Sequence, residues 1–317
     1  MKIKKHIIAA AVSAAAVFFL CSCSGSGELR LGTGNPGGIY YSYGNTLREM
    51  DGNKISVKRT EGSQANMRLL DEDFLDLAIV QSDVLAEAVE GSGSFDGEPV
   101  ERIRAVAGLY SEAFHIVVRG DSGIESLSDL KGKKISVGEE GSGAVHNLTH
   151  LLTSAGVSEK SVQTVCMSYT ESAEALESGG IDAFFCVLGA PSTVISELYA
   201  DDNVRLLAID ERTAGAMTEL FSGYFSMTIP AGTYSGQDSD IQTIGVKAVL
   251  TADSRIDSGR IREVTAALFE KGSSIKFSLS VPEPDLEFAV TDIPCEFHEG
   301  AAQYYESAGI SVDTAEN

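Results

Sequence analysis

Glycine-rich turns hold the residues of this chain that are best suited to bind a small solute. One turn spans residues 32–38, another begins at Gln81, and a third spans residues 138–143. Each turn follows a short apolar run and precedes a helical pattern, so each presents unpaired N–H groups at a helix start. Glycine lets the backbone approach a bound group closely, and a carboxylate is well matched to such donors. These turns therefore predict a site for a small acid.

Side chains next to the turns extend the predicted site. Tyr40 and Tyr41 offer an apolar wall and a phenolic hydroxyl, and Gln81 can donate and accept hydrogen bonds at once. Because neighbouring helical residues point in different directions, we expect one of the two tyrosines to pack in the core. The predicted ligand contacts are Thr33, Gly37, Gly38, Tyr40, Tyr41, Ser63, Gln81, Ser82, Ser142, Gly143, Ala144, Gly189 and Pro191.

Two of these candidates also fit purely structural roles. Ser63 ends the segment TEGS at residues 60–63, which is typical of a helix N-cap, so its hydroxyl is expected to serve either the cap or the solute. Pro191 fits the first turn of a helix as well as it fits a pocket wall. Both interpretations stay open at the level of sequence.

The N-terminal residues are typical of an exported lipoprotein. Three lysines precede an apolar run over residues 7–20, which is too short for an ordinary membrane span, and a small residue precedes Cys23. We predict a signal peptide at residues 1–22, lipidation of Cys23 and a short tether at residues 23–27. Cys21 fits less well because a bulky leucine precedes it, and an uncleaved membrane anchor is the alternative. The predicted location is the periplasm or the outer face of the cell membrane.

The net charge and the number of cysteines argue against a nucleic-acid-binding protein and against a disulfide-stabilised fold. The net charge is −22, and loss of the signal peptide removes three lysines and no acid, so nucleic acid is not an expected partner. If Cys23 is lipidated, Cys166, Cys186 and Cys295 remain, and this odd number gives no disulfide framework. A bridge between Cys166 and Cys186 stays open, although buried, inert thiols are the simpler interpretation.

Repeated units of strand, turn and helix must position the predicted contacts. Short apolar runs alternating with helices predict an α/β fold with two lobes, each a largely parallel sheet flanked by helices. The turns at the carboxyl ends of such strands line a common crevice. The strand-like runs span residues 29–31, 55–57, 77–80, 134–137, 162–167 and 184–188, and helical stretches include residues 40–50, 64–70 and 144–152.

Short motifs stand in order along almost the whole mature chain. They are GTG at 32–34, GGIYY at 37–41, QSD at 81–83, LYSE at 109–112, FH at 114–115, LKGK at 130–133, GSG at 141–143, PAGTY at 230–234 and HEGA at 298–301, followed by Tyr304 and Tyr305. In this order they resemble the TAXI family, the solute receptors of TRAP transporters. The resemblance implies a type II periplasmic-binding-protein fold, in which two lobes close around one ligand.

The resemblance also implies a function and a division of the chain. Residues 28–115 would form lobe 1, residues 116–225 would form lobe 2, and residues 226–317 would return largely to lobe 1. Such a receptor hands a small organic acid, with glutamate or another carboxylate as the familiar ligand, to TRAP permease subunits, and we expect a monomer without catalysis or cofactor. Ala144 stands where the family usually has threonine, so the missing hydroxyl leaves one end of the ligand undefined.

Two patterns in the chain resemble sites for a dinucleotide cofactor and for a metal ion. Residues 32–37 have the spacing GxGxxG of a dinucleotide-binding turn, but Glu61 comes too late in the chain for the ribose contact and Pro36 stiffens the loop. His146 and His150 have the spacing of two metal ligands on one helix, but no third ligand follows nearby. We therefore predict neither a cofactor nor a metal.

Two other functions remain as alternatives to a transport receptor. An exported lipoprotein of the same kind could report its solute to a signalling partner. A serine hydrolase would use Ser142 with a histidine, but Glu140 replaces the first glycine of the GxSxG turn that such a nucleophile needs. The hydrolase is the weaker alternative.

Overall fold

A computed structural model describes residues 27–36, 38–52, 54–200, 203–272 and 282–315. The predicted signal peptide and Cys23 lie outside the described residues, as does Gly37 among the predicted ligand contacts. In the described part of the chain, no helix is both long enough and apolar enough to span a bilayer.

The described strands form one continuous mixed sheet. Its order is β2-β1-β3-β10-β4-β7-β5-β6, with β9 beside β10 and β8 beside β4. The strands are β1 (Leu29–Gly32), β2 (Ile55–Lys58), β3 (Leu77–Gln81), β4 (Ile103–Arg119), β5 (Lys134–Ser136), β6 (Gln163–Val165), β7 (Ala183–Leu188), β8 (Val204–Leu206), β9 (Tyr224–Ile229) and β10 (Ile241–Asp253). The strands β2-β1-β3 and β7-β5-β6 are parallel, whereas β4, β8, β9 and β10 join antiparallel neighbours.

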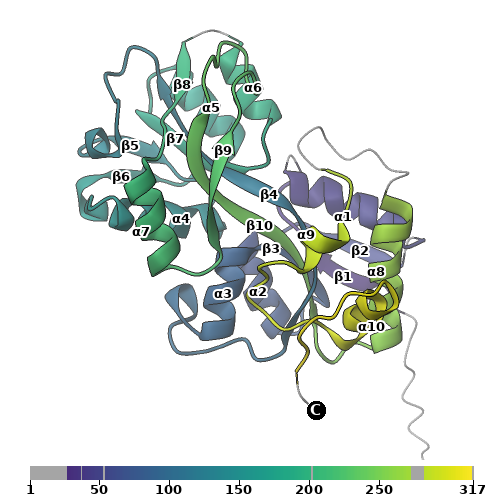
Figure 1. The fold of residues 1–317 in the computed structure, drawn as a ribbon. Helices are drawn as coiled ribbons and strands as arrows, with labels where there is room; N and C mark the ends of the chain where they lie inside the picture. Colours follow the sequence, from purple (N-terminus) through teal and green to yellow (C-terminus); the bar gives the residue numbers. More distant parts are fainter. Residues whose placement is uncertain (1–26, 37, 53, 201–202, 273–281, 316–317) are drawn as a thin grey trace, which may run out of the picture.

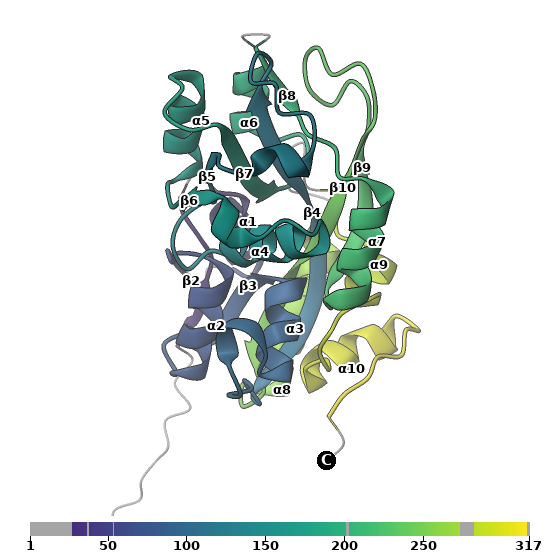
Figure 2. The same ribbon diagram turned by 90° about the vertical axis from the view of Figure 1, so that its left-hand side faces the viewer.

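Helices flank the sheet on both faces (Figures 1 and 2). The helices are α1 (Ile39–Met50), α2 (Ser63–Asp71), α3 (Ser82–Glu90), α4 (Gly143–Ser154), α5 (Tyr169–Glu177), α6 (Thr193–Tyr199), α7 (Glu211–Leu220), α8 (Ser258–Lys271), α9 (Leu286–Val290) and α10 (Glu299–Ser307). Short 3-10 turns are η1 (Gly93–Phe95), η2 (Leu127–Leu130) and η3 (Glu159–Ser161). The predicted α/β fold class is confirmed by this architecture.

Two halves are stacked along the long strands β4 and β10. In Figure 1, α4 to α7 gather around one end of these strands, and α1 to α3 with α8 to α10 gather around the other. β3 and β7 are buried along their whole length, as expected for strands covered on both faces. Leu250 belongs to the apolar core of the first half and Val246 to that of the second, so β10 supplies both cores.

The long strands carry the chain between the halves. β4 pairs with β10 up to Ala113 and with β7 from Ala113 to Val118, so the predicted boundary between residues 115 and 116 falls inside β4. The second predicted boundary, between residues 225 and 226, falls inside β9. Because β9 pairs with the first part of β10, we propose that the chain returns to lobe 1 within β10.

The cysteines of the described chain are free thiols, so Cys166 and Cys186 form no bridge. Cys186 is buried in β7, and this burial raises its pKa. Cys166 lies just beyond β6 and is exposed, so the expectation of a buried thiol is wrong there. Cys295 is half-buried, and burial raises its pKa to about 11.

Candidate functional site

Turns from opposite halves meet at the interface between them. A β-carbon on Gly62, at the start of α2, would lie 3.5 Å from the Cα of Ser142, at the start of α4. Nearby, the side-chain amide of Asn35 donates a hydrogen bond to the carboxylate of Glu139. The N-terminal ends of α2 and α4 therefore lie close together, although they come from different halves of the sheet.

Gln81 and Gly143 make the tightest approach across this interface. A β-carbon on Gly143 would lie only 1.7 Å from Oε1 of Gln81, so no residue but glycine fits without a shift. Oε1 of Gln81 and Oγ of Ser142 are both buried without a hydrogen-bond partner. Most buried polar atoms in folded proteins have a partner, and an unpaired one requires an explanation such as a bound group. One predicted contact from each half thus presents an unpaired polar atom here.

A buried glutamate that was not among the predicted contacts lies beside them. Glu112 accepts a hydrogen bond from the hydroxyl of Tyr40 at 2.8 Å, and the hydroxyl of Tyr110 is 3.4 Å from its other oxygen. Burial raises the pKa of Glu112 to about 8, against the opposite effect of the hydrogen bonds from Tyr40, Tyr110 and Gln81. The signal in the sequence was a carboxylate inside a long apolar run, where an unpaired charge is costly.

Asp83, at the start of α3, joins the two halves through a second buried carboxyl group. Its Oδ2 atom accepts hydrogen bonds from Tyr224 Oη at 2.9 Å and from Asn147 Nδ2 at 2.5 Å. Burial raises the pKa of Asp83 to about 7, and Oδ1 has no partner. Because Asn147 lies on α4 and Tyr224 begins β9, this network spans the interface.

Tyr169, the first residue of α5, lies beside Ser142 and was not among the predicted contacts. Its Cε1 atom lies 3.1 Å from the position of a β-carbon on Gly138, and Oγ of Ser142 lies 3.2 Å from the same position. Burial raises the pKa of Tyr169 well above its ordinary value. Its place after β6, at the carboxyl end of a parallel strand, could have identified it, because the other predicted turns share that place.

Hydroxyl groups of three more predicted contacts have partners within the fold. The hydroxyl of Thr33 donates to Lys58 O at 2.8 Å, and that of Ser82 donates to Gly223 O at 2.6 Å. Ser63 is the first residue of α2, and its hydroxyl accepts from the N–H of Gln81 at 3.1 Å. The N-cap is Gly62, so the helix cap that was one of the two roles expected for Ser63 is not formed.

The remaining predicted contacts differ in exposure and position. Gly38 is the N-cap of α1, and Tyr41 in the first turn of that helix is half-buried. Ala144 is buried in the apolar core of the second half, while Gly189 and Pro191 lie between β7 and α6. Contact of these residues with a ligand stays a prediction.

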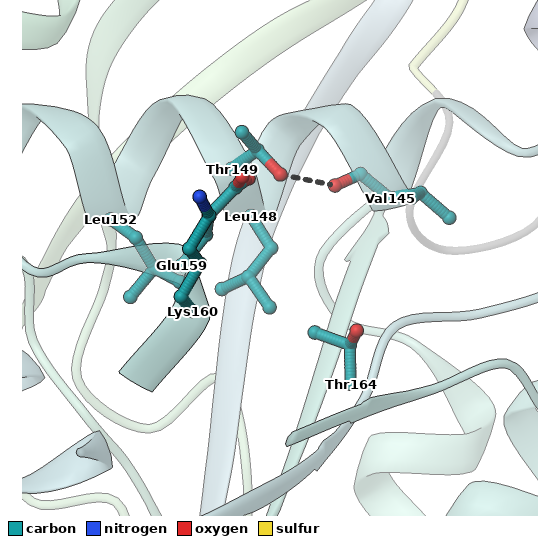
Figure 3. Close-up of a pocket in the computed structure, with 7 residues that line it drawn as sticks. All are labelled: Val145, Leu148, Thr149, Leu152, Glu159, Lys160 and Thr164. Carbon is teal, nitrogen blue, oxygen red and sulfur yellow. Dashed lines mark hydrogen bonds between the residues drawn. The ribbon is translucent and has the colours of Figure 1, made fainter. Parts of the chain in front are cut away.

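A separate pocket of about 180 Å³ lies along α4 and is lined by none of the predicted contacts (Figure 3). Its lining comes from α4, from η3 and from β6. The lining residues are Val145, Leu148, Thr149, Leu152, Glu159, Lys160 and Thr164. Four of them lie on α4, and the side chain of Thr149 bonds back to Val145 O in its own helix.

Solved structures share this fold. PhnD1 from Prochlorococcus marinus, in complex with methylphosphonate, has a TM-score of 0.52 at 13% identity, over 92% of this chain and 94% of that chain. A protein from Bordetella bronchiseptica RB50 has a TM-score of 0.52 at 16% identity, over 91% and 84%. A binding protein component of an ABC phosphonate transporter from Pseudomonas aeruginosa has a TM-score of 0.51 at 11% identity, over 76% and 74%. These likenesses confirm the predicted two-lobed binding-protein fold.

The sequence itself matches a family model over most of its length. The model describes the NMT1-like family, and the match runs from residue 31 to residue 309. It therefore includes every described strand and helix except the start of β1. The chain belongs to the NMT1-like family.

Proposed function

We propose that this protein is an extracytoplasmic solute-binding protein that captures a small ligand between its two halves and delivers it to a membrane transporter. The observation that carries the proposal is the pair of unpaired, buried polar atoms, Gln81 Oε1 and Ser142 Oγ. A ligand that bonds to both atoms contacts both halves at once. Its binding energy then favours the closed arrangement over an open one. The two-lobed fold and the family membership support this function.

The proposed ligand is a small organic acid, with glutamate first among the candidates. The starts of α2 and α4 favour a negative group, because their first N–H groups lack partners within the helix. Glu112 adds a second feature, since its buried carboxyl group, besides the bonds from Tyr40 and Tyr110, can accept from an ammonium or hydroxyl donor. An amino acid supplies both groups. Phosphonates belong in the same test, because PhnD1 is in complex with methylphosphonate.

The proposed partner is the permease of a TRAP transporter, to which the motifs GTG, GGIYY and GSG point by resemblance. An ABC-type permease is the second candidate, supported by the fold shared with the phosphonate-transporter component from Pseudomonas aeruginosa. Lipidation of Cys23 would keep the receptor at the membrane beside either permease. Capture of permease subunits by cross-linking on intact cells distinguishes the two transporter classes.

A ligand screen followed by calorimetry tests the proposed site. Amino acids, other carboxylic acids, phosphonates and neutral sugars are screened by thermal shift, because a ligand of the folded state raises its melting temperature. We expect Gln81→Ala and Ser142→Ala each to weaken binding of the best ligand by about tenfold or more. Gln303→Ala, at a half-buried position on α10, and Ser178→Ala, at an exposed position after α5, serve as controls. Unchanged affinity in both site variants would place the ligand elsewhere.

The serine hydrolase is not favoured by the geometry around Ser142. Its hydroxyl is buried without a hydrogen-bond partner, so no histidine of the described chain is placed to accept its proton. His115 Nε2 is bonded to Tyr234 Oη at 2.7 Å instead. A sensor that binds the same solute differs from a transport receptor only in its partner. Capture of a signalling protein in place of a permease would therefore favour the sensor.

A further inference from the structure

Three side chains of the kinds that bind metal ions meet at the interface between the halves. Glu87 lies on α3 of the first half, and His146 and His150 lie one turn apart on α4 of the second half. One ligand atom from each of the three lies within 4.8 Å of the other two. Nε2 of His150 is 3.6 Å from Oε1 of Glu87. The cluster is thus formed only when the two halves are together.

The hydrogen bonds of His150 determine which ring nitrogen faces the cluster. Nδ1 of His150 lies 2.9 Å from Tyr224 Oη, and that hydroxyl donates to Asp83 Oδ2. Since the hydroxyl has only one proton to donate, it accepts from the Nδ1–H of His150. The lone pair of Nε2 therefore faces Glu87. The ring is also fixed by Phe221, which stacks on it at a centroid distance of 3.8 Å.

Ser94 holds the carboxylate of Glu87 through the oxygen that does not face His150. Its Oε2 atom accepts from the N–H and the hydroxyl of Ser94, at 3.4 and 3.5 Å. A β-carbon on Gly93 would lie 2.4 Å from this carboxylate, so the η1 turn packs closely against it. Oε1 is buried and has no hydrogen-bond partner. This free oxygen is the one that faces His150.

Nε2 of His150 and Oε1 of Glu87 present lone pairs to one another across the interface. Two buried lone pairs that face one another at 3.6 Å are unfavourable without a positive charge between them. A neutral imidazole with its lone pair free is also the form in which histidine binds a metal.

We propose that Glu87, His146 and His150 bind a divalent transition-metal ion, with zinc first among the candidates, and that the ion joins the two halves. Two imidazoles and one carboxylate suit zinc, cobalt or nickel, and a water molecule completes a four-coordinate site. Tyr224 holds His150 in the orientation that metal-ligating histidines commonly receive from a hydrogen-bonded neighbour. The sequence did not predict this site because the third ligand, Glu87, lies on a helix much earlier in the chain than the two histidines.

The ion would act on the balance between open and closed forms. It contacts both halves, so it binds the closed arrangement better and shifts the population toward it. The proposed metal ligands are different residues from the proposed solute contacts Gln81 and Ser142, so metal binding and solute binding can be measured separately. By linkage, each would strengthen the other.

Calorimetry with zinc and cobalt salts tests the site on the mature chain without an affinity tag. After treatment with chelator, the wild type is expected to bind one ion, and cobalt is expected to give the visible absorption of a four-coordinate complex. Glu87→Gln and His146→Ala should each weaken binding by about tenfold or more. Glu90→Gln, one turn further along α3, is the matched control and should bind as the wild type does.

Several results would overturn the proposal. They are an absence of binding, equal binding in the wild type and in both variants, or loss of binding in His146→Ala while Glu87→Gln binds normally. The last result would show a site on α4 that does not join the halves. Melting curves without metal establish that the variants fold. If neither variant folds, the cobalt spectrum of the wild type tests the proposal. A six-coordinate spectrum would contradict a site with these three ligands.

Discussion

Gly143 illustrates how a single missing side chain can set the distance between two halves of a protein. Its hydrogen atom faces Oε1 of Gln81, at a place where a methyl group has no room. The motif GSG at residues 141–143 suggested only that backbone N–H groups would approach a ligand. The structure adds that the last glycine also lets the glutamine of the opposite half come close. Which residue stands opposite could not be predicted, because it depends on how the halves pack.

Replacement of Gly143 by alanine should therefore weaken solute binding. We expect Gly143→Ala to push the side-chain amide of Gln81 aside and to lower affinity by about tenfold, since Oε1 would then leave the position in which it is proposed to contact the ligand. Calorimetry with the best ligand from the screen measures the effect. Gly215→Ala in α7, where a β-carbon would meet no atom within 4 Å, is the control. Equal affinity in the two variants would contradict the tight approach.

The raised pKa of Glu112 predicts that the stability of the folded protein depends on pH. Its pKa is about 8 in the folded protein and about 4.3 in an unfolded chain, so between these values the folded state keeps a proton that the unfolded state has lost. The free energy of unfolding then falls as pH rises from about 5 to about 8. Asp83, with a pKa of about 7, acts in the same direction.

Melting temperatures of the ligand-free protein at pH 5, 6.5 and 8 test this expectation. The wild type should lose several degrees over this range, while Glu112→Gln should lose less, because an amide does not titrate. Glu219→Gln, at an exposed position on α7, should follow the wild type. A melting temperature that rises with pH in the wild type would show that the two buried carboxyl groups do not control the dependence.

At the level of elements, α8 and α10 pack against each other through a glycine. Gly300 lies in the first turn of α10, and a β-carbon there would lie 2.0 Å from Ser258 O in α8. His298 caps α10 by accepting the N–H of Gly300 with Nδ1 at 3.1 Å. The motif HEGA at residues 298–301 therefore has a structural explanation, since its histidine begins a helix and its glycine allows the packing.

Gly300→Ala is expected to lower the free energy of unfolding by about 2 kcal/mol or more, because the clash involves backbone atoms that cannot rotate away. The melting temperature would fall by roughly 5 °C. Differential scanning calorimetry measures the change against Gly215→Ala, which adds the same methyl group at an open helical position. A fall of the same size in both variants would show that the helix contact is not responsible.

Elements with strong local patterns were predicted well, and elements defined by distant partners were not. The apolar runs of β3 and β7 and the helix that follows Gly143 needed only their own residues to be identified. The antiparallel course of β10 depends on pairing with β3 and β4, which no local pattern records. For the same reason the site was predicted as separate turns, whereas the pairing of Gln81 with Gly143 and the position of Glu87 beside two histidines came only from the structure.

At the level of the whole molecule, the predicted lipid at Cys23 and the proposed solute site belong to one function. A receptor that is anchored to the membrane can reach a permease by diffusion in the plane of the membrane alone. We expect Cys23→Ser to release the protein from the membrane fraction while leaving solute affinity within about twofold, because the tether at residues 23–27 precedes β1 and the site. Fractionation of cells and calorimetry on the released protein measure the two quantities. A variant that stays with the membrane would contradict lipidation at Cys23.

The pairing of β3 with β10 has a consequence for the timing of assembly. β3 pairs with a strand that follows it by more than 160 residues, in a register that runs from Leu77 opposite Ala252 to Gln81 opposite Ala248. Until that strand leaves the ribosome, one edge of β3 has no neighbour, and contacts between such distant segments form slowly. If the predicted signal peptide directs export, the precursor must stay unfolded while it passes through the translocation channel. The late synthesis of β10 would delay completion of the sheet beside β3 until most of the chain has been made.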